Sequence, residues 1–140
     1  MRCLIDANII LDVLLDREPF IQDADKIWIL CETERIEGHV TSLAFTNIVY
    51  VLRQKLDAEM IQKVLSYLRL IFCFDELKPD DLVKAAALRW DDYEDAVQYV
   101  IASRIKADHI VTRNKKDFTQ NKISVLNPEE LLEAINDPAR

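Results

Sequence analysis

The sequence contains a single glycine, Gly38, among its 140 residues. A chain with so little glycine has no glycine-rich loop for cradling phosphates and no flexible linker between domains. Internal repeats and low-complexity segments are also lacking. Half of the residues are hydrophobic, which is enough to build a sizeable core in a domain of this length. We therefore expect a single domain that spans residues 1–140.

Cysteine pairs and long apolar runs are lacking as well. There is no Cys-x-x-Cys motif for zinc or redox chemistry, and apolar surroundings predict buried free thiols in a reducing compartment for the three cysteines, Cys3, Cys31 and Cys73. The longest stretch without Asp, Glu, Lys or Arg, residues 38–52, is too short to span a bilayer. Asp6 and Asp12 interrupt the one N-terminal apolar run that could serve as a signal peptide. The sequence predicts a soluble, cytoplasmic protein with no membrane contact.

Basic residues are outnumbered, 18 against 25 acidic ones, and the net charge is −7. Such a surface opposes sequence-independent binding of nucleic acid, which therefore needs a local basic patch. One candidate patch lies between residues 104 and 116, where Asp108 is the one acid among five basic residues: Arg104, Lys106, Arg113, Lys115 and Lys116. An ordinary solvated surface is an equally open interpretation of this cluster.

Short apolar runs alternate along the chain with segments of helical periodicity. The runs predict five strands, at residues 2–6, 39–42, 72–76, 109–113 and 123–126. Helical segments fill the first three intervals and follow the fifth strand, and a loop connects the fourth strand to the fifth. This alternation predicts an α/β fold in which a parallel five-stranded sheet is covered by helices on both faces.

Polar residues mark where several of the predicted helices begin. Ser42 is expected to cap the helix after the second strand, and Asp57 the helix after that. Asn127 caps the last helix, with Glu130 completing a capping box. Gly38 is expected to end the helical region that precedes the second strand.

Acidic side chains from three separate segments fall at one edge of the predicted sheet. Asp6 ends the first strand, Asp117 follows the fourth, and Glu94 and Asp95 lie in the first turn of the helix that leads into the fourth. Ligands of parallel sheets bind at the carboxyl ends of the strands, where these acids can meet. Clustered carboxylates repel one another, and a hard divalent cation such as Mg²⁺ removes that repulsion. A metal held there could activate water and brace a phosphate for in-line attack.

Taken singly, several polar residues of this region have a simpler interpretation. Asp6 or Asn8 alone is a common helix cap, and Asp91 and Asp92 are expected to cap the helix that contains Asp95. Asp12 lies about one and a half helical turns after Asp6, and the simplest interpretation is that it faces water. The coincidence of acids from three segments, rather than any single one, indicates a metal site.

Four segments together resemble the PIN-domain nucleases, and more closely the branch that includes the VapC-type ribonuclease toxins: "LIDANIILDVLL", "TSLAFTNIVYVLRQ", "DYEDAVQYVIASRIKADHIVTRNKKDF" and "SVLNPEELL". The resemblance runs essentially from end to end. It implies a three-layer α/β/α sandwich with a central parallel sheet and cleavage of RNA phosphodiester bonds that depends on Mg²⁺ or Mn²⁺. It also implies a homodimer and a cognate antitoxin protein as inhibitor.

Carried over position by position, the resemblance places the family's catalytic and metal-binding acids on Asp6, Asp95 and Asp117. The family's second acid, usually a glutamate on the helix after the second strand, falls on Asn47, whose amide oxygen supplies no negative charge. Glu94 could compensate as a further metal ligand. The candidates for supporting the site are Asn8, Asn47 and Asn114, and the candidates for contacting RNA phosphates are Arg104, Arg113, Lys115 and Lys116.

Other functions compete with the nuclease interpretation. A phospho-receiver domain has a similar length and a similar acid cluster, but its lysine after the fifth strand is missing from "SVLNP". A haloacid-dehalogenase-type phosphatase would begin with Asp-x-Asp, and Asn8 cannot act as its general acid. A PIN-like module that binds RNA or protein without catalysis remains open because of Asn47.

The early helices carry more large apolar side chains than one face of a small sheet should need. Most of them are expected in the core, and the remainder could form a two-fold interface. We therefore expect a homodimer, with interface candidates among Phe20, Ile21, Trp28, Phe45, Val49, Tyr50 and Leu68.

Overall fold

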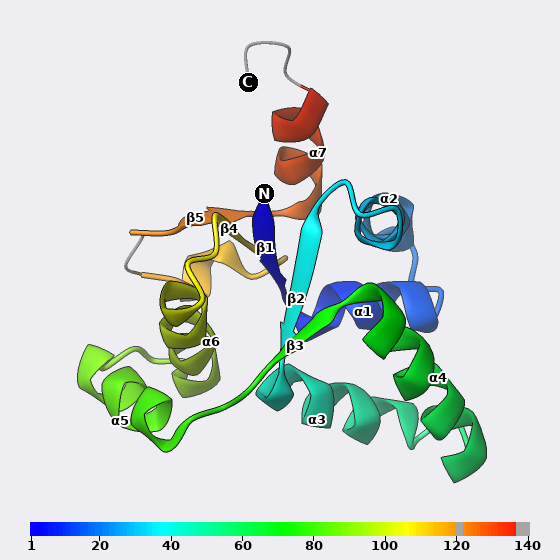
Figure 1. The fold of residues 1–140 in the computed structure, drawn as a ribbon, viewed down its shortest axis with the longest axis horizontal. Coiled ribbons are helices and arrows are strands. Elements are labelled where there is room, and N and C mark those ends of the chain that lie inside the picture. The colour runs from blue at the N-terminus through cyan, green and yellow to red at the C-terminus, as the bar shows by residue number, and fades with distance from the viewer. Residues whose placement is uncertain (120–121, 137–140) are drawn as a thin grey trace.

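In the computed structural model, which describes residues 1–119 and 122–136, five strands form one sheet with helices on both faces (Figure 1). The sheet order is β3-β2-β1-β4-β5, and every neighbouring pair is parallel. β1 is central, and the strand order reverses between β1 and β4, where sheets of this kind bind their ligands. The strands are β1 (Arg2–Ile5), β2 (Glu37–Thr41), β3 (Cys73–Asp75), β4 (His109–Val111) and β5 (Ser124–Leu126).

The helices form two layers. Five pack their buried residues against one face of the sheet: α1 (Ala7–Leu14), α2 (Ile21–Glu32), α3 (Ser42–Leu52), α4 (Ala58–Ile71) and α7 (Pro128–Asn136). The other face is covered by α5 (Pro79–Leu88) and α6 (Tyr93–Arg104), and a short 3₁₀ helix, η1 (Lys115–Asp117), follows β4. The predicted three-layer α/β/α sandwich is confirmed. Within the described residues, no helix combines the length and apolar character that crossing a membrane requires.

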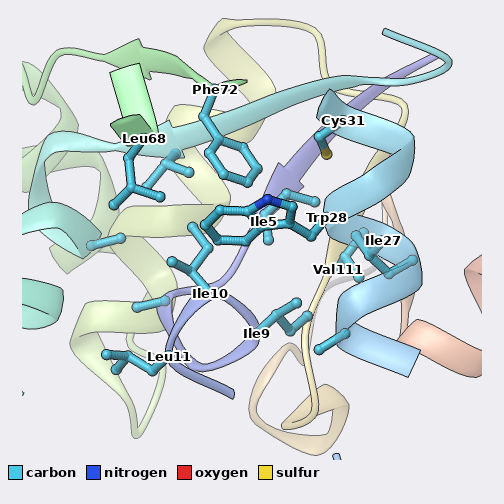
Figure 2. Packing of buried hydrophobic residues seen from close by; sticks show 14 of the residues in the cluster. Ile5, Ile9, Ile10, Leu11, Ile27, Trp28, Cys31, Leu68, Phe72 and Val111 are labelled. Carbon is cyan, nitrogen blue, oxygen red and sulfur yellow. The ribbon is translucent and has the colours of Figure 1, made fainter. Parts of the chain in front are cut away.

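The larger core lies between the sheet and the helices of the five-helix layer (Figure 2). Trp28 of α2 contacts Phe72 edge to face, with ring centroids 5.4 Å apart. Trp28 and Leu68 are buried, so neither belongs to an exposed interface. By contrast, Phe20 and Tyr50 are 43% and 70% exposed.

Gly38 lies inside β2 rather than at the end of a helix. A Cβ atom at this position would lie 2.6 Å from the Cys31 Sγ and 2.9 Å from a ring carbon of Phe72. The prediction that Gly38 ends the helical region was wrong, because close packing of β2 against α2 requires this glycine. The residue with left-handed backbone after α2 is Glu34, at a φ of 60°.

The helix caps agree with the sequence at two positions and differ at one. Asp57 caps α4, and Asn127 and Glu130 form the expected capping box at α7. The cap of α3 is Thr41, whose hydroxyl oxygen accepts a hydrogen bond of 3.0 Å from a first-turn amide. Ser42 instead donates to a β3 carbonyl at 2.9 Å. It is the first residue of α3, because β2 ends at Thr41, one residue earlier than expected.

The cysteines differ in burial. Cys3 and Cys31 are buried, and burial raises the pKa of each thiol to about 12. Cys73 is exposed, which corrects the prediction of three buried thiols. It begins β3, an edge strand of the sheet, where a side chain has a strand neighbour on one side only.

Candidate metal centre

Asp6 lies directly after β1, at the carboxyl edge of the sheet and the start of α1. Its amide donates to the Val111 carbonyl of β4 at 3.0 Å, and its carboxylate accepts a hydrogen bond of 2.7 Å from the Thr112 hydroxyl. The register pairs Ile5 with Val111, which makes Asp6 and Thr112 neighbours. Sequence reasoning missed Thr112 as part of this site, because the pairing of the first strand with the fourth was not predicted.

The first turn of α6 brings further carboxylates to the same edge. Asp92 caps this helix by accepting a hydrogen bond of 3.0 Å from the Asp95 amide, whereas Asp91 does not cap it. Asp92, Asp95 and Asp117 of η1 each place a carboxylate oxygen within 4.8 Å of the others. The start of α6 and η1, which are distant in the sequence, therefore converge, and Asp92 joins the cluster in addition to capping α6.

A cavity of about 320 Å³ opens at this edge of the sheet. Its apolar lining consists of Leu11, Val51 and Tyr50. Sequence reasoning did not place Tyr50 at this site. The cavity thus brings together carboxylates from the end of β1 and the start of α6 and the three predicted supporting amides, whereas Asp117 is not among its lining residues. Its polar lining consists of Asp6, Asn8, Asn47, Asp92, Glu94, Asp95 and Asn114.

Three carboxylates that line this cavity, those of Asp6, Glu94 and Asp95, have raised pKa values. Burial, followed by the negative charges of Asp92, Asp6, Asp117 and Glu94, raises the pKa of Asp95 to about 7. Burial also raises the pKa of Asp6, against the opposing hydrogen bonds from Thr112 and from the amides of Ala7 and Asn8 and the positive charge of Arg113. In the described part of the chain, no lysine or arginine nitrogen lies within 4.0 Å of the carboxylates of Asp6, Glu94 or Asp95. A cluster of carboxylates without an ion-pair partner could bind a divalent cation, which would offset their repulsion.

Asn47 and Glu94 face each other across the cavity from α3 and α6. The Asn47 amide donates a hydrogen bond to the Glu94 carboxylate. Burial raises the pKa of Glu94, as do the charges of Asp92 and Asp6, while the bond from Asn47 lowers it. A neutral donor in this place holds Glu94 without adding to the repulsion among the acids.

The predicted phosphate-binding residues are not all close to the acids. Arg104 lies in the last turn of α6, about 13 Å along the helix axis from Asp95, and its guanidinium binds Asp81 at 2.9 Å. Lys115 pairs with Glu130 at 2.7 Å on the surface. Lys116 is exposed beside Asp117 in η1.

Arg113 is bound on two sides. Its Nε and Nη2 donate to the two Asp12 carboxylate oxygens at 2.9 and 3.2 Å, and its guanidinium lies 3.8 Å from the centroid of the Phe20 ring. Arg17 adds a second cation 3.6 Å from the Asp12 carboxylate. Asp12 is 1% exposed. The interpretation that Asp12 faces water was wrong, because its partner comes from a loop 101 residues further along the chain.

A second group of potential ligands lies elsewhere, along β2 and β3. Glu37, His39 and Cys73 also place donor atoms within 4.8 Å of one another. The two ring nitrogens of His39 are each 2.8 Å from a carboxylate, that of Asp75 and that of Glu37, and Arg2 lies 3.3 Å from Glu37. Glu37 and Asp75 therefore each have a basic side chain as partner, whereas Asp6 and Glu94 accept hydrogen bonds from the neutral groups of Thr112 and Asn47.

The PIN domain model matches residues 2–116, and the chain belongs to the PIN domain family. Comparison with curated protein sequences gives no match.

Solved structures share the fold over nearly their full length. A toxin–antitoxin complex from Klebsiella pneumoniae is 20% identical, with a TM-score of 0.69 over 90% of this chain and 97% of that one. VapBC-1 from nontypeable Haemophilus influenzae is 13% identical, with a TM-score of 0.69 over 92% and 99%. VapC20 from Mycobacterium tuberculosis is 8% identical, with a TM-score of 0.67 over 87% and 98%. At such identities the likeness defines the fold alone.

Proposed function

We propose that the protein is a metal-dependent endoribonuclease and the toxin of a type II toxin–antitoxin pair. The observation that carries this proposal is a cluster of acids without ion-pair partners, in a chain of the PIN domain family. The cluster lies at the carboxyl edge of the sheet, where the strand order reverses between β1 and β4. The similar structures support it: one is described as a toxin–antitoxin complex and another as a toxin that cleaves the sarcin–ricin loop.

The metal ligands in this proposal are Asp6, Asp95 and Asp117, with Glu94 as a fourth. All four offer carboxylate oxygens, which are the donors that Mg²⁺ and Mn²⁺ prefer. When bound, such an ion would neutralise the cluster, lower the pKa of a water molecule and brace the scissile phosphate.

The chain itself holds these ligands in place. The Thr112 hydroxyl orients the Asp6 carboxylate, and the Asp92 cap fixes the turn that carries Asp95. The amides of Asn8 and Asn114 face the same cavity, where they can donate to phosphate oxygens.

Glu94 takes over, in this proposal, the role that the resemblance assigns to a glutamate at position 47. The two positions face the same cavity, and the Asn47 amide binds and orients the Glu94 carboxylate. The negative charge is thereby supplied from α6 instead of α3. A binding module without catalysis is the second candidate, and the observation that favours it is the neutral side chain at position 47.

Contacts with RNA phosphates are assigned to Lys116 and Lys115, which lie beside Asp117 in η1. Lys115 is free to exchange its partner, because an exposed ion pair such as that with Glu130 contributes little stability. Arg104 is too far along α6 to take part. A local basic patch of this kind reconciles an RNA substrate with the net charge of −7.

Assembly with an antitoxin and as a homodimer, in the cytoplasm, completes the proposal. Exposed apolar side chains offer candidate contact surface, the largest exposed fractions being those of Tyr50 (70%), Val83 (68%) and Leu70 (83%). Sedimentation at micromolar concentration measures the assembly state, and a monomer alone would contradict the homodimer.

RNA cleavage by the purified protein tests the proposal. Cleavage should require Mg²⁺ or Mn²⁺, stop in excess chelator, and disappear in Asp6→Ala, which removes a metal ligand. Asp6→Ala should remain folded, because deleting one of several clustered acids relieves repulsion. Asp91→Asn is the matched control, since this neighbouring acid is not among the cavity residues and its loss should leave the rate unchanged. Cleavage that persists in Asp6→Ala or in chelator would refute the nuclease assignment.

A further inference from the structure

The ion pair between Asp12 and Arg113 requires the burial of a charged carboxylate, which is unfavourable in free energy. A carboxylate that is 1% exposed has lost nearly all of its hydration, which ion pairing offsets only in part. Such pairs are weak evidence for stability, since well-packed apolar residues would serve the core as well. Their best-attested contribution is to set one geometry in preference to others. The relevant question is which geometry this pair sets.

Arg113 stands between two residues of the candidate metal centre. Thr112, before it, donates to Asp6, and its hydroxyl oxygen also accepts a hydrogen bond of 3.1 Å from the Asn114 amide. Asn114, after it, lines the cavity, and its carbonyl accepts a hydrogen bond of 3.1 Å from the Asp117 amide. The loop 112–117 thus forms a chain of contacts from Asp6 to Asp117, with Arg113 in its middle.

The Arg113 side chain is fixed from two directions at once. The carboxylate of Asp12, on α1, accepts hydrogen bonds from Nε and Nη2 at one edge of the guanidinium. The ring of Phe20, just before α2, packs against the guanidinium, with its centroid 3.8 Å from Cζ. A planar fork bound at its edge and stacked on its face has little freedom to rotate. The loop is therefore tied to the helical layer at the one position that separates its two site residues.

We propose that Asp12 and Arg113 are positioning residues, which hold the loop 112–117 so that Asn114 and Asp117 face the carboxylates of β1 and α6. This inference rests on the proposed function for its catalytic consequence, although its structural part does not. Neither residue touches the metal or the substrate. Their loss is expected to loosen the loop and weaken metal binding while the sheet and its two helical layers remain folded.

The chain contains a matched control for this pair. Asp81 of α5 is 2% exposed, and it accepts two hydrogen bonds from Arg104 at 3.1 and 2.9 Å. The burial of the carboxylate and its double hydrogen bond to an arginine match those of Asp12, although Asp81 also accepts a hydrogen bond from the Lys78 amide and Asp12 has Arg17 as a second cation. The Asp81 pair lies at the far end of α6 from Asp95. A general loss of stability should follow from breaking either pair, but a loss of metal affinity should follow only from breaking the first.

The experiment compares Asp12→Asn, Asp81→Asn and the wild type by hydrogen exchange and by Mn²⁺ titration. In metal-free protein, Asp12→Asn should speed exchange of the Asn114 and Asp117 amides without speeding it in β1 or α6. It should also weaken Mn²⁺ binding by about tenfold or more, the usual effect of losing a residue that orients a ligand. Asp81→Asn should change neither quantity, and excess Mn²⁺ should restore RNA cleavage in Asp12→Asn toward the wild-type kcat.

Two outcomes would overturn the inference. One is unchanged exchange of the loop amides in Asp12→Asn, and the other is an equal loss of Mn²⁺ affinity in Asp12→Asn and Asp81→Asn, which would indicate general destabilisation. If the wild type cleaves no RNA in Mn²⁺, the proposed function fails, and the loop exchange alone then decides whether Asp12 positions the loop.

Discussion

Carboxylates form ion pairs with arginine in one part of this molecule and lie together without an ion pair in another. Asp12 and Asp81 are each almost fully buried, and each accepts two hydrogen bonds from one arginine. At the carboxyl edge of the sheet, Asp6 and Asp95 lie among further acids, with no lysine or arginine within ion-pair distance in the described residues. The chain thus supplies arginines for the buried acids Asp12 and Asp81, whereas Arg113, the arginine beside Thr112 at this edge, pairs with Asp12 and leaves room for an external cation at Asp6 and Asp95.

The comparison has a direct consequence for stability without metal. Asp81→Asn leaves Arg104, whose side chain is 28% exposed, without its counter-charge, and should cost about 2 kcal/mol. Asp95→Asn removes one of several repelling charges and should raise the melting temperature at pH 8 by a few degrees. Thermal unfolding in chelator measures both changes. If both variants lost stability, or both gained it, the two groups of acids would not differ in the way described.

The dependence of stability and of Mn²⁺ affinity on pH is a second test of this comparison. Because the pKa of Asp95 rises from 3.8 to about 7 on folding, the folded state holds this proton more tightly than the unfolded state. The contribution of Asp95 to metal-free stability is therefore greatest at low pH and declines as pH rises from about 4 to about 7. Mn²⁺ must displace the proton, so its affinity should increase about tenfold from pH 6 to pH 8.

Calorimetric titration of Mn²⁺ at several pH values measures this dependence. The matched variant is Asp95→Asn, in which the residual affinity should vary much less over the same range. A wild-type affinity that is flat between pH 6 and pH 8 would contradict the raised pKa.

A smaller effect is expected at position 47. Asn47→Glu replaces the donor to Glu94 with a second carboxylate. Without metal, the added repulsion should lower the melting temperature, and with metal the added charge should strengthen Mn²⁺ binding several-fold. Melting curves in chelator and in Mn²⁺ measure the gap between the two forms, which should widen. An unchanged gap and an unchanged affinity would remove position 47 from the site.

The smallest effect is expected for the exposed pair Lys115–Glu130. Lys115→Met removes a surface ion pair and leaves the capping box of Glu130 with Asn127 in place. Exposed pairs contribute about 0.5 kcal/mol or less. Urea unfolding should therefore show almost no change. A loss as large as that of Asp81→Asn would mean that exposure does not separate the two kinds of pair.

The sequence predicted the fold where local patterns were sufficient. Alternating apolar runs and helical segments indicated five parallel strands between two helical layers, and Asp57 marked the start of α4 at Ala58. The convergence of Asp6, Glu94 and Asp95 followed from strand direction alone, and these three residues line one cavity. Their role as metal ligands stays a prediction.

Features that depend on distant partners were not predictable in the same way. Asp12 looks like a surface residue of a short helix until Arg113 is placed beside it, and Thr112 joins Asp6 only through the pairing of β1 with β4. Gly38 looks like a helix terminator, whereas its role depends on Cys31 and on a phenylalanine from the end of α4. In each case the deciding contact joins residues that no local pattern relates.

Titration with Mn²⁺ tests the central claim most directly, that the acids at the carboxyl edge form a site for a divalent cation. Mn²⁺ is added at pH 8 to the wild type, to Asp95→Asn and to Asp81→Asn, and binding is followed by calorimetry and by the melting temperature. We predict one bound ion and a raised melting temperature for the wild type and for Asp81→Asn, and a much weaker affinity with a smaller rise in melting temperature for Asp95→Asn. Equal binding by all three proteins, or no binding by the wild type, would contradict the claim.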